Sequence, residues 1–266
     1  MSEITVATLN LFINPEGRWP QRAPLIVRQF LEIKPDVIGL QEVDHTIDQA
    51  NWLVTWINGE LGHQEYAAYH MFNPRGVSGF ESLAIVTRLP VVEHDGLDYL
   101  ATDNIAHRVR LELDGGNFLD FYNTHLYWVP SRAGSVIRRK QAERLLQWVA
   151  LHGQKGLQVI VGDFNAVPTG QTTALMKSIF RSAHEVAQGR EPARTWPSPL
   201  ISTVNVMRSF GVSSLPPDYS GTLDYIFVSS GIEVREARVT FDQPDATDNT
   251  LYPSDHFGLM ARLKVV

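Results

Sequence analysis

The chain has 266 residues, a formal net charge of −6 at pH 7 and no cysteine. The missing cysteines exclude disulfides and thiolate metal sites, so any metal must be bound through oxygen or imidazole ligands. The acidic balance argues against a generic, tight binder of nucleic acid, which would carry a basic surface. No stretch approaches the roughly 18 apolar residues of a transmembrane segment, and the first residues form no export signal. We therefore expect a cytoplasmic protein, and we take it to be a monomer.

Apolar periodicity divides the chain into strands and helices. We expect strands at residues 3–9, 36–40, 64–72, 82–88, 91–100, 105–113, 117–126, 159–165, 223–228, 234–240 and 257–266. Helical spacing predicts helices at residues 19–33, 47–61, about 133–151 and about 170–178. The segment from about 187 to 221 is rich in Pro, Gly and Ser, which predicts a long loop over one face.

Strands outnumber helices, and hairpin-like pairs of strands alternate with single helices. This order is typical of two packed sheets with helices on their outer faces. We predict an α/β (α+β) fold, a four-layered sandwich of two mixed, mostly antiparallel sheets flanked by helices. No repeat of fixed period and no linker interrupts the sequence, so residues 1–266 are expected to form a single domain.

Polar side chains recur where the apolar runs of the predicted strands stop. Taken singly, each has an ordinary interpretation as a turn residue, a helix N-cap or a salt-bridge partner. Buried carboxylates, however, cost free energy unless they are paired or bound to a metal. Nine such positions together predict one polar site, made of Asn10, Glu42, Glu81, His125, Asp163, Asn165, Asp224, Asp255 and His256.

Oxygen ligands at strand ends suit Mg²⁺, which needs only one or two carboxylates because it keeps several water molecules. Glu42 is the first choice as a metal ligand, with Asn10 beside it and Asp255 completing the set. We therefore expect Mg²⁺ as cofactor, with Mn²⁺ as a possible substitute.

Six short motifs contain most of these residues: Thr8-Leu9-Asn10, Leu40-Gln41-Glu42, Asn123-Thr124-His125, Gly162-Asp163-Phe164-Asn165, Leu223-Asp224-Tyr225-Ile226 and Ser254-Asp255-His256. Their order resembles that of the endonuclease/exonuclease/phosphatase superfamily of deoxyribonuclease-like, metal-dependent phosphoesterases, from residue 4 to the C-terminus. The resemblance implies an enzyme that hydrolyses a phosphodiester or phosphomonoester by in-line attack of water. It also implies the same three metal ligands.

The resemblance further implies roles for the remaining residues. His256 is similar to the base that activates or holds the attacking water, and Asp224 would orient its imidazole. Asp163 would position the water or assist the leaving group, and Asn165 would donate a hydrogen bond to a phosphoryl oxygen. Which of these residues is the general base stays open.

His125 implies a subclass, since members specialised for abasic DNA carry tyrosine there, whereas deoxyribonuclease-type nucleases, sphingomyelinases and deadenylases carry histidine. As imidazolium, His125 could bind a non-bridging oxygen or protonate the leaving oxygen. Glu81 falls where deoxyribonuclease-like members place the carboxylate partner of this histidine; alternatively, it is a surface residue of an edge strand. Arg108 or Arg110 falls where the family often has a basic residue that reaches the phosphate.

The six motifs do not define the substrate, which could be nucleic acid, a lipid head group or a small phosphoester. The alternatives to a general phosphoesterase are a DNA or RNA nuclease, a sphingomyelinase-like lipid phosphodiesterase, and a non-catalytic binding module on the same fold. A binding module should show a broken motif, and none of the six is broken. Tyr127, Trp128 and Trp196 could stack a base or sugar, or simply cover apolar surface.

Overall fold

The computed structural model describes residues 2–14, 17–73, 81–100, 102–152, 156–201 and 221–265. The described strands form two six-stranded sheets. The first sheet contains β1 (Ser2–Asn10), β2 (Val37–Asp44), β3 (Ala67–Phe72), β4 (Glu81–Thr87), β11 (Ile232–Thr240) and β12 (Gly258–Val265). The second contains β5 (Val91–Asp98), β6 (Ile105–Leu113), β7 (Asn117–His125), β8 (Leu157–Asp163), β9 (Arg181–Ser182) and β10 (Asp224–Val228).

The strand orders are β11-β12-β1-β2-β4-β3 in the first sheet and β5-β6-β7-β8-β10-β9 in the second. Two neighbouring pairs, β1 with β2 and β7 with β8, run in parallel. The other described pairs are antiparallel. Parallel neighbours bring the carboxyl ends of both strands to the same edge of a sheet, and these two pairs carry Asn10 and His125 at their ends.

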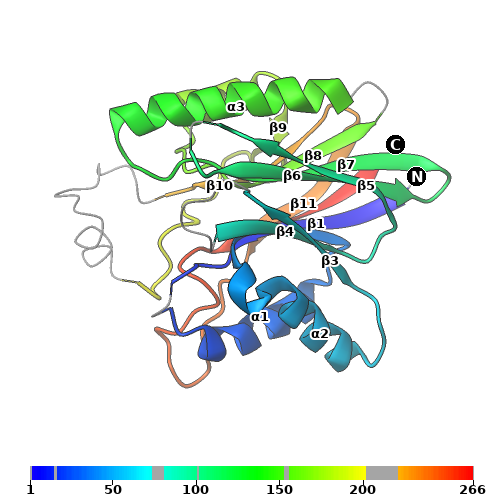
Figure 1. Ribbon diagram of the computed structural model, residues 1–266, viewed down its shortest axis with the longest axis vertical. Helices are drawn as coiled ribbons and strands as arrows, with labels where there is room; N and C mark the ends of the chain where they lie inside the picture. The colour runs from blue at the N-terminus through cyan, green and yellow to red at the C-terminus, as the bar shows by residue number, and fades with distance from the viewer. Residues whose placement is uncertain are drawn as a thin grey trace.

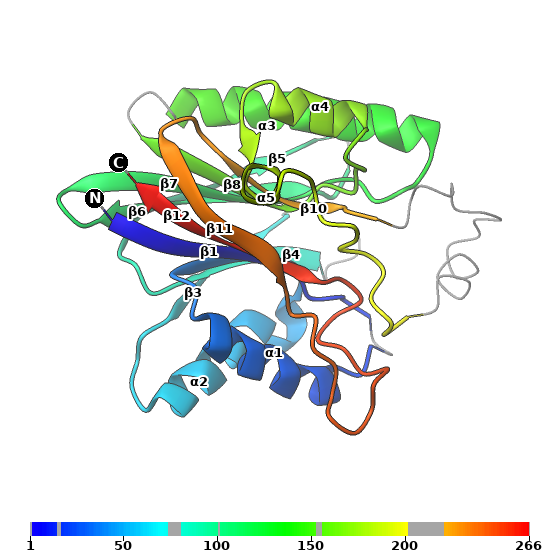
Figure 2. The ribbon, with the colours of Figure 1, turned by 180° about the vertical axis from the view of Figure 1, so that it is seen from behind.

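In the described part of the chain, four longer helices cover the outer faces of the sandwich, and one short helix, α5 (Ala183–Gln188), packs against β10 and β11 and contributes Ala183 to the core between the sheets. The longer helices are α1 (Trp19–Ile33), α2 (Gln49–Leu61), α3 (Arg132–His152) and α4 (Gln171–Lys177), besides a 3₁₀ turn at His45–Ile47. Figure 1 shows α1 and α2 beyond the first sheet and α3 beyond the second, with both sheets between them. The view from behind places α4 beside α3 (Figure 2). The predicted four-layered sandwich of two mixed sheets flanked by helices is confirmed.

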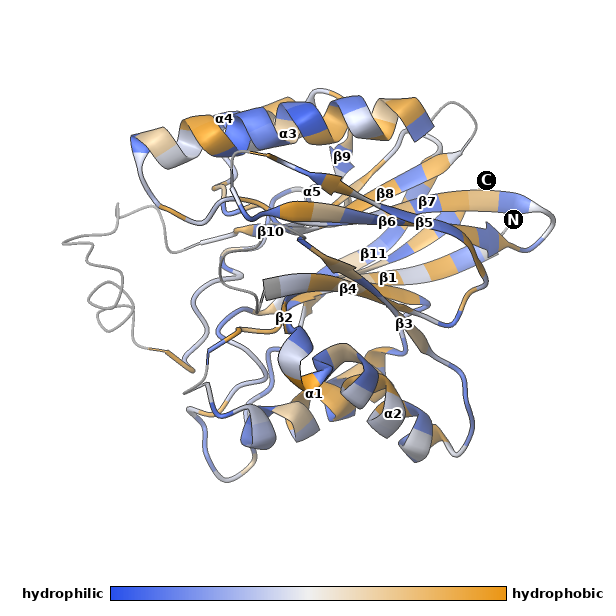
Figure 3. Ribbon diagram, in the orientation of Figure 1, coloured by the Kyte–Doolittle hydropathy of each residue, from blue (hydrophilic) through white to orange (hydrophobic). Residues whose placement is uncertain are grey.

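Three apolar clusters hold these layers together. Val6 and Val109 belong to the cluster between the two sheets, Ile26 to the cluster under α1 and α2, and Leu145 to the cluster under α3. Apolar residues accordingly line most strands of both sheets (Figure 3). Strands buried on both faces explain why the sequence shows nearly continuous apolar runs rather than strict alternation.

The structure differs most from the predicted elements at two places, besides shifts of up to three residues at the ends of other elements and the 3₁₀ turn at His45–Ile47. β2 continues to Asp44 rather than ending at Leu40, because a register shift between Leu40 and Val43 lets the strand resume after an irregular step. β9 and α5 were not predicted, since elements of two and six residues are too short to show a period. Part of the predicted long loop, residues 202–220, lies outside the described residues.

Within the described residues, no helix has the length and apolarity needed to cross a membrane.

His107 is an unusual member of the core between the sheets. It lies on β6 on the same face as Val109 and is fully buried. Neither of its ring nitrogens has a hydrogen-bond partner among the described residues. Burial lowers the pKa of His107 to about 3, and the nearby imidazoles of His94 and His70 contribute in the same direction.

We expect His107 to make the folded protein less stable in mild acid. Its imidazole is neutral in the folded protein, whereas the unfolded chain binds a proton below the ordinary pKa of 6.5. The stabilisation is therefore present above pH 6.5 and lost as the pH falls, by up to about 1.4 kcal/mol per pH unit. Denaturant titrations at a series of pH values from neutral to mildly acidic should give a steeper loss for wild type than for His107→Leu. Equal slopes would contradict this assignment.

Candidate active site

Three of the predicted site residues lie in one row across the second sheet. β7 pairs with β8 so that His125 lies beside Asp163, and β8 pairs with β10 so that Asp163 lies beside Asp224. Side chains of directly paired residues point to the same face of a sheet. The register of three neighbouring strands therefore brings together residues from three distant parts of the sequence.

The backbone before Asp163 requires a glycine. Gly162 has a φ of 142°, and a Cβ at this position would lie 1.9 Å from the carbonyl oxygen of Thr124 on the neighbouring strand. No other residue fits such a close approach, because a contact this short cannot be relieved without moving the backbone. The glycine thus lets β7 and β8 stay paired up to the point where Asp163 enters the site.

Asp163 is the centre of the group. Its carboxylate is 1% exposed and contacts side chains from both sheets. The Oδ2 atom accepts a hydrogen bond from Nδ2 of Asn10 (3.2 Å). The same oxygen lies 3.6 Å from Nε2 of His125 and 3.7 Å from Nε2 of His256. The Oδ1 atom accepts a hydrogen bond from the backbone N–H of Asn165 (2.8 Å).

Asn10 and Glu42 enter the site from the first sheet. Nδ2 of Asn10 donates to Oε1 of Glu42 (3.0 Å), and the backbone N–H of Ile13 donates to Oε2 (2.9 Å). Glu42 has a φ of 51° and lies within the register shift of β2. Such a bulge re-aims the side chain that it carries, which is how a residue inside a strand comes to point toward the strand's end.

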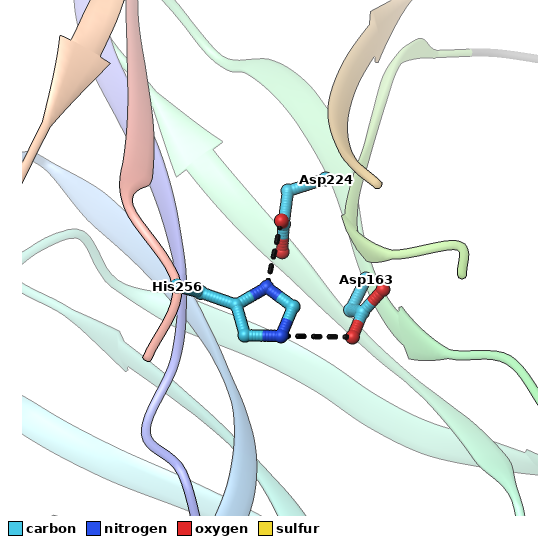
Figure 4. A group of neighbouring side chains, drawn as sticks. All are labelled: Asp163, Asp224 and His256. Atoms are coloured by element: carbon cyan, nitrogen blue, oxygen red, sulfur yellow. Dashed lines mark hydrogen bonds and ion pairs between the residues drawn. The ribbon is translucent and has the colours of Figure 1, made fainter. Parts of the chain in front are cut away.

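His256 and Asp224 form a buried ion pair (Figure 4). Nδ1 of His256 donates to Oδ2 of Asp224 at 2.9 Å. Burial lowers the pKa of His256, but the negative charges of Asp224, Asp255 and Asp163 outweigh it and raise the pKa well above 6.5. Burial also raises the pKa of Asp163, and the charge of Asp224 adds to that shift. These charges therefore favour the imidazolium form of His256.

Asp255 is held in place by a tryptophan. Its Oδ2 accepts a hydrogen bond from Nε1 of Trp196 (3.2 Å), and its Oδ1 accepts one from Oγ of Ser254 (3.3 Å). Trp196 is only 6% exposed, and its ring centroid lies 6.4 Å from that of His256. Trp196 therefore packs behind the site and orients a carboxylate, which the sequence-based alternatives of stacking or surface cover did not include.

The donor set fits a hard divalent cation. Burial raises the pKa values of Asp163 and Asp255, and Oδ1 of Asp224 has no hydrogen-bond partner among the described residues. The negative charge of this group is thus incompletely compensated, and a cation would compensate it. Donor atoms of Asp163, Asp224 and His256 lie within 4.8 Å of one another. The hydrogen bond between Nδ1 of His256 and Oδ2 of Asp224 already engages two of these three residues.

The structure does not bring Arg108 into this group. Its guanidinium is 1% exposed and donates to Asp120 (2.7 Å) and Glu93 (3.0 Å), with Asp95 at 3.4 Å. Arg110 also pairs with Asp120, at 3.3 Å. Arg108 alternates with Val109 and lies on the outer face of β6, away from the core between the sheets. Three carboxylates therefore neutralise the charge that was predicted to reach a phosphate.

Two further predicted residues have different outcomes. Asn165 reaches the site through its backbone N–H, while its Nδ2 donates to the carbonyl oxygen of Leu126 (3.0 Å). Glu81 is the first residue of β4 and pairs with Asp44 in the strand register. Its side chain lies outside the part of the chain that the structure describes, so its pairing with His125 stays a prediction.

A buried amide pair beneath the site was not predicted. Nε2 of Gln41 on β2 donates to Oδ1 of Asn123 on β7 (2.7 Å). Nδ2 of Asn123 donates back to the carbonyl oxygens of Leu40 (2.8 Å) and Ala84 (3.0 Å) in the first sheet. Both amides are fully buried, so these bonds tie the two sheets together without competition from water. Gln41 and Asn123 each lie inside one of the six motifs, and this position was the only indication in the sequence that they belong near the site.

A model of the Endonuclease/Exonuclease/phosphatase family matches residues 7–256, and the chain belongs to this family. The family inferred from the six motifs is confirmed, and its members are hydrolases of phosphoester bonds. The match covers every residue placed in the site above.

The proteins that are similar to this chain are named after different functions. The chain is 27% identical to human Nocturnin over 270 residues, which is 91% of this chain and 58% of that protein. It is 25% identical over 311 residues to a putative neutral sphingomyelinase of Caenorhabditis elegans, covering 99% of this chain and 67% of that protein. The crystal structure of an endonuclease/exonuclease/phosphatase from Bacteroides vulgatus superposes with a TM-score of 0.76 at 18% identity, covering 100% of both chains. The chain thus spans less than two thirds of Nocturnin.

Replacing Asp224 by Asn should lower the pKa of His256 in the metal-free protein. The substitution keeps the shape of the side chain but removes the first of the negative charges that raise this pKa. Titration of the imidazole resonances by NMR measures the shift directly. Asp114→Asn, an exposed change at the β6–β7 turn, is the matched control and should leave the His256 resonance unchanged. A His256 pKa equal to wild type in Asp224→Asn would contradict the ion pair.

Proposed function

We propose that this protein is a divalent-metal-dependent phosphoesterase that hydrolyses a phosphodiester or phosphomonoester by in-line attack of water. One observation carries the proposal: the Asp163 carboxylate lies between the imidazoles of His125 and His256 and is joined through Asn10 to Glu42. Proton-transfer groups and oxygen ligands for a hard cation thus surround one buried centre. Membership in the family supports the same reaction class.

Glu42, Asn10 and Asp255 are the residues that we assign to Mg²⁺ or Mn²⁺. The Oδ1 atom of Asn10 accepts a hydrogen bond from the backbone N–H of Phe12 (2.9 Å) and, as a carbonyl oxygen, has a second lone pair. Burial raises the pKa of Asp255, and a cation bound nearby would favour its ionised form. When bound, the ion neutralises charge on the phosphoryl and leaving oxygens.

Asp163 is the best placed residue to accept the proton of the attacking water. Burial raises the pKa of its carboxyl, which makes the carboxylate a stronger base than one exposed to solvent. His256 keeps its proton because Asp224 holds Nδ1 and raises the pKa of the ring. Its Nε2 then donates to a phosphoryl oxygen rather than accepting from water. Nε2 of His125, on the other side of Asp163, serves a second phosphoryl oxygen or the leaving oxygen.

The rim of the site favours a substrate with a planar ring next to the phosphate. Tyr127 and Trp128 follow His125 in the chain, with ring centroids 6.5 Å apart, and Trp128 is 39% exposed. Nη1 of Arg138 donates to the carbonyl oxygens of Tyr127 (2.9 Å) and Val129 (2.9 Å) and holds this loop. Aromatic side chains on a loop whose backbone is held in this way can stack a nucleobase. We therefore place nucleotide-containing phosphoesters ahead of lipid head groups and inositol phosphates.

A substrate panel tests the proposal. We expect hydrolysis of a chromogenic phosphodiester in the presence of Mg²⁺ or Mn²⁺ and none with a chelator. RNA, plasmid DNA, sphingomyelin and an inositol polyphosphate are then compared under the same conditions. Glu42→Gln should lower metal-dependent turnover by a factor of roughly 10²–10⁴ at unchanged folding, because it removes a ligand charge at the edge of the core. Glu112→Gln on the exposed side of β6 is the control and should match wild type. Wild-type activity in Glu42→Gln would remove Glu42 from the site.

Asp163→Asn and His256→Ala should each reduce turnover by a factor of about 10²–10⁴, the scale for losing a general base or a key charged donor. The losses should appear in kcat more than in KM, because both groups act on charge that develops during the reaction. Steady-state kinetics on the chromogenic substrate measures both constants. A pure KM effect in either variant would assign that residue to substrate binding alone.

A further inference from the structure

Arg22 is a charged residue in the first turn of α1 that is completely buried. Its guanidinium donates hydrogen bonds to four backbone carbonyl oxygens. Nη1 donates to Leu11 (2.9 Å) and Pro253 (2.7 Å), Nη2 donates to Phe12 (3.1 Å), and Nε donates to Gly17. Four of the five N–H groups of the side chain are therefore used within the protein, which leaves it little capacity to contact a substrate.

The carbonyl groups that Arg22 binds belong to two separate loops of the site. Leu11 and Phe12 directly follow Asn10, at the point where β1 ends. Pro253 lies two residues before Asp255, in the irregular segment that precedes β12. Strand pairing does not fix these two loops to each other, and the guanidinium binds both of them. An exposed ion pair between Arg18 and Asp248 (3.0 Å) also joins the two segments, but it lies at the surface.

The surroundings hold the guanidinium in one orientation. Its central carbon lies 5.5 Å from the ring centroid of Phe12 and 5.6 Å from that of Trp19. Burial lowers the pKa of Arg22 to about 10, while the negative charges of Asp255 and Glu42 act in the opposite direction. The side chain is thus cationic at neutral pH and faces the two carboxylates assigned to the metal.

We propose that Arg22 is a positioning residue of the metal site, which fixes the Asn10 loop against the Asp255 loop and thereby sets the affinity for the divalent cation. The inference rests on the proposed function, because it takes Glu42, Asn10 and Asp255 as the ligands. Groups that orient ligands in this way typically change metal affinity 10- to 100-fold when they are replaced. Arg22 acts through backbone carbonyls rather than through the ligands themselves.

Lysine and glutamine separate the geometry of Arg22 from its charge. Arg22→Lys keeps the positive charge but replaces the planar fork by one ammonium group with three donors, which cannot reach four carbonyls in fixed directions. Arg22→Gln removes the charge as well. Two variants are made because burying unpaired carbonyls destabilises the fold, and near-UV circular dichroism identifies the folded ones.

The experiment measures Mn²⁺ binding to the metal-free protein by isothermal titration calorimetry, without substrate. We expect Arg22→Lys and Arg22→Gln to bind Mn²⁺ roughly 10- to 100-fold more weakly than wild type. The Mn²⁺ concentration that half-saturates hydrolysis of the chromogenic phosphodiester should rise by the same factor. A merely structural role would lower the unfolding temperature and leave both quantities unchanged.

Arg138→Lys is the matched control. Arg138 is a second buried arginine, 6% exposed, whose guanidinium binds the carbonyls of Tyr127 and Val129 on the loop after His125. Its replacement should leave Mn²⁺ affinity at the wild-type value. Wild-type affinity in a folded Arg22 variant, or equal weakening in Arg138→Lys, would overturn the proposal. A wild-type protein that binds no Mn²⁺, or a Glu42→Gln variant that binds it normally, would instead refute the metal site itself.

Discussion

The structure depends on the burial of carboxylates at one end of a β-sandwich. Asp163 and Asp224 are each 1% exposed and Asp255 is 7% exposed. Removing a carboxylate from water costs several kcal/mol even after the protein has relaxed. The surrounding features reduce this cost: the His256 imidazolium, the buried Arg22, the hydrogen bond from Trp196 and the amide of Asn10. The compensation among the described residues stays incomplete, and the residual negative charge would favour the binding of a cation.

The pairing of the strands determines which polar side chains lie together in this buried group. His125, Asp163 and Asp224 lie in one row because β7, β8 and β10 are neighbours in register. The first sheet contributes Asn10, at the end of β1, and Glu42, in the bulge of β2. The buried bond between Gln41 and Asn123 lies between the two sheets and holds their ends in alignment. A shift of one residue in any of these strands would point its polar side chain to the opposite face.

The sequence predicts the fold well where local patterns are strong. The helix expected at residues 19–33 is α1 (Trp19–Ile33), since its apolar stripe is regular and Pro35 prevents continuation. Several motif residues lie together in the structure, while the roles that the resemblance implied for them stay predictions; they are Asn10, Glu42, His125, Asp163, Asp224 and His256. Features that depend on contacts between distant parts of the chain could not be predicted from the sequence. The bulge that re-aims Glu42 depends on pairing with β4, and no pattern within β2 reveals it.

The sequence did not predict where the side chains of Arg108 and Arg22 lie. Arg108 lies on a strand buried on both faces, so alternation did not reveal that it faces away from the site. Arg22 lies near the start of a helix, where an arginine normally stays exposed unless it is paired. Its burial follows only from the meeting of two loops that are more than 230 residues apart in the sequence.

Arg22 and Arg138 both bind buried backbone carbonyl groups of loops next to the site, one after β1 and the other after β7. A site at the ends of strands is necessarily bounded by loops, and loops packed against a helix bury carbonyl groups that no strand partner can satisfy. A guanidinium satisfies several such groups at once in a fixed geometry, which a point charge cannot do. Arg22 does so for the loop after Asn10, and Arg138 for the loop after His125. Of these two arginines, only Arg22 also binds the loop before Asp255 and feels the charges of the two carboxylates that we assign to the metal. Its effect should therefore reach the proposed cation, while that of Arg138 should stop at the loop after His125.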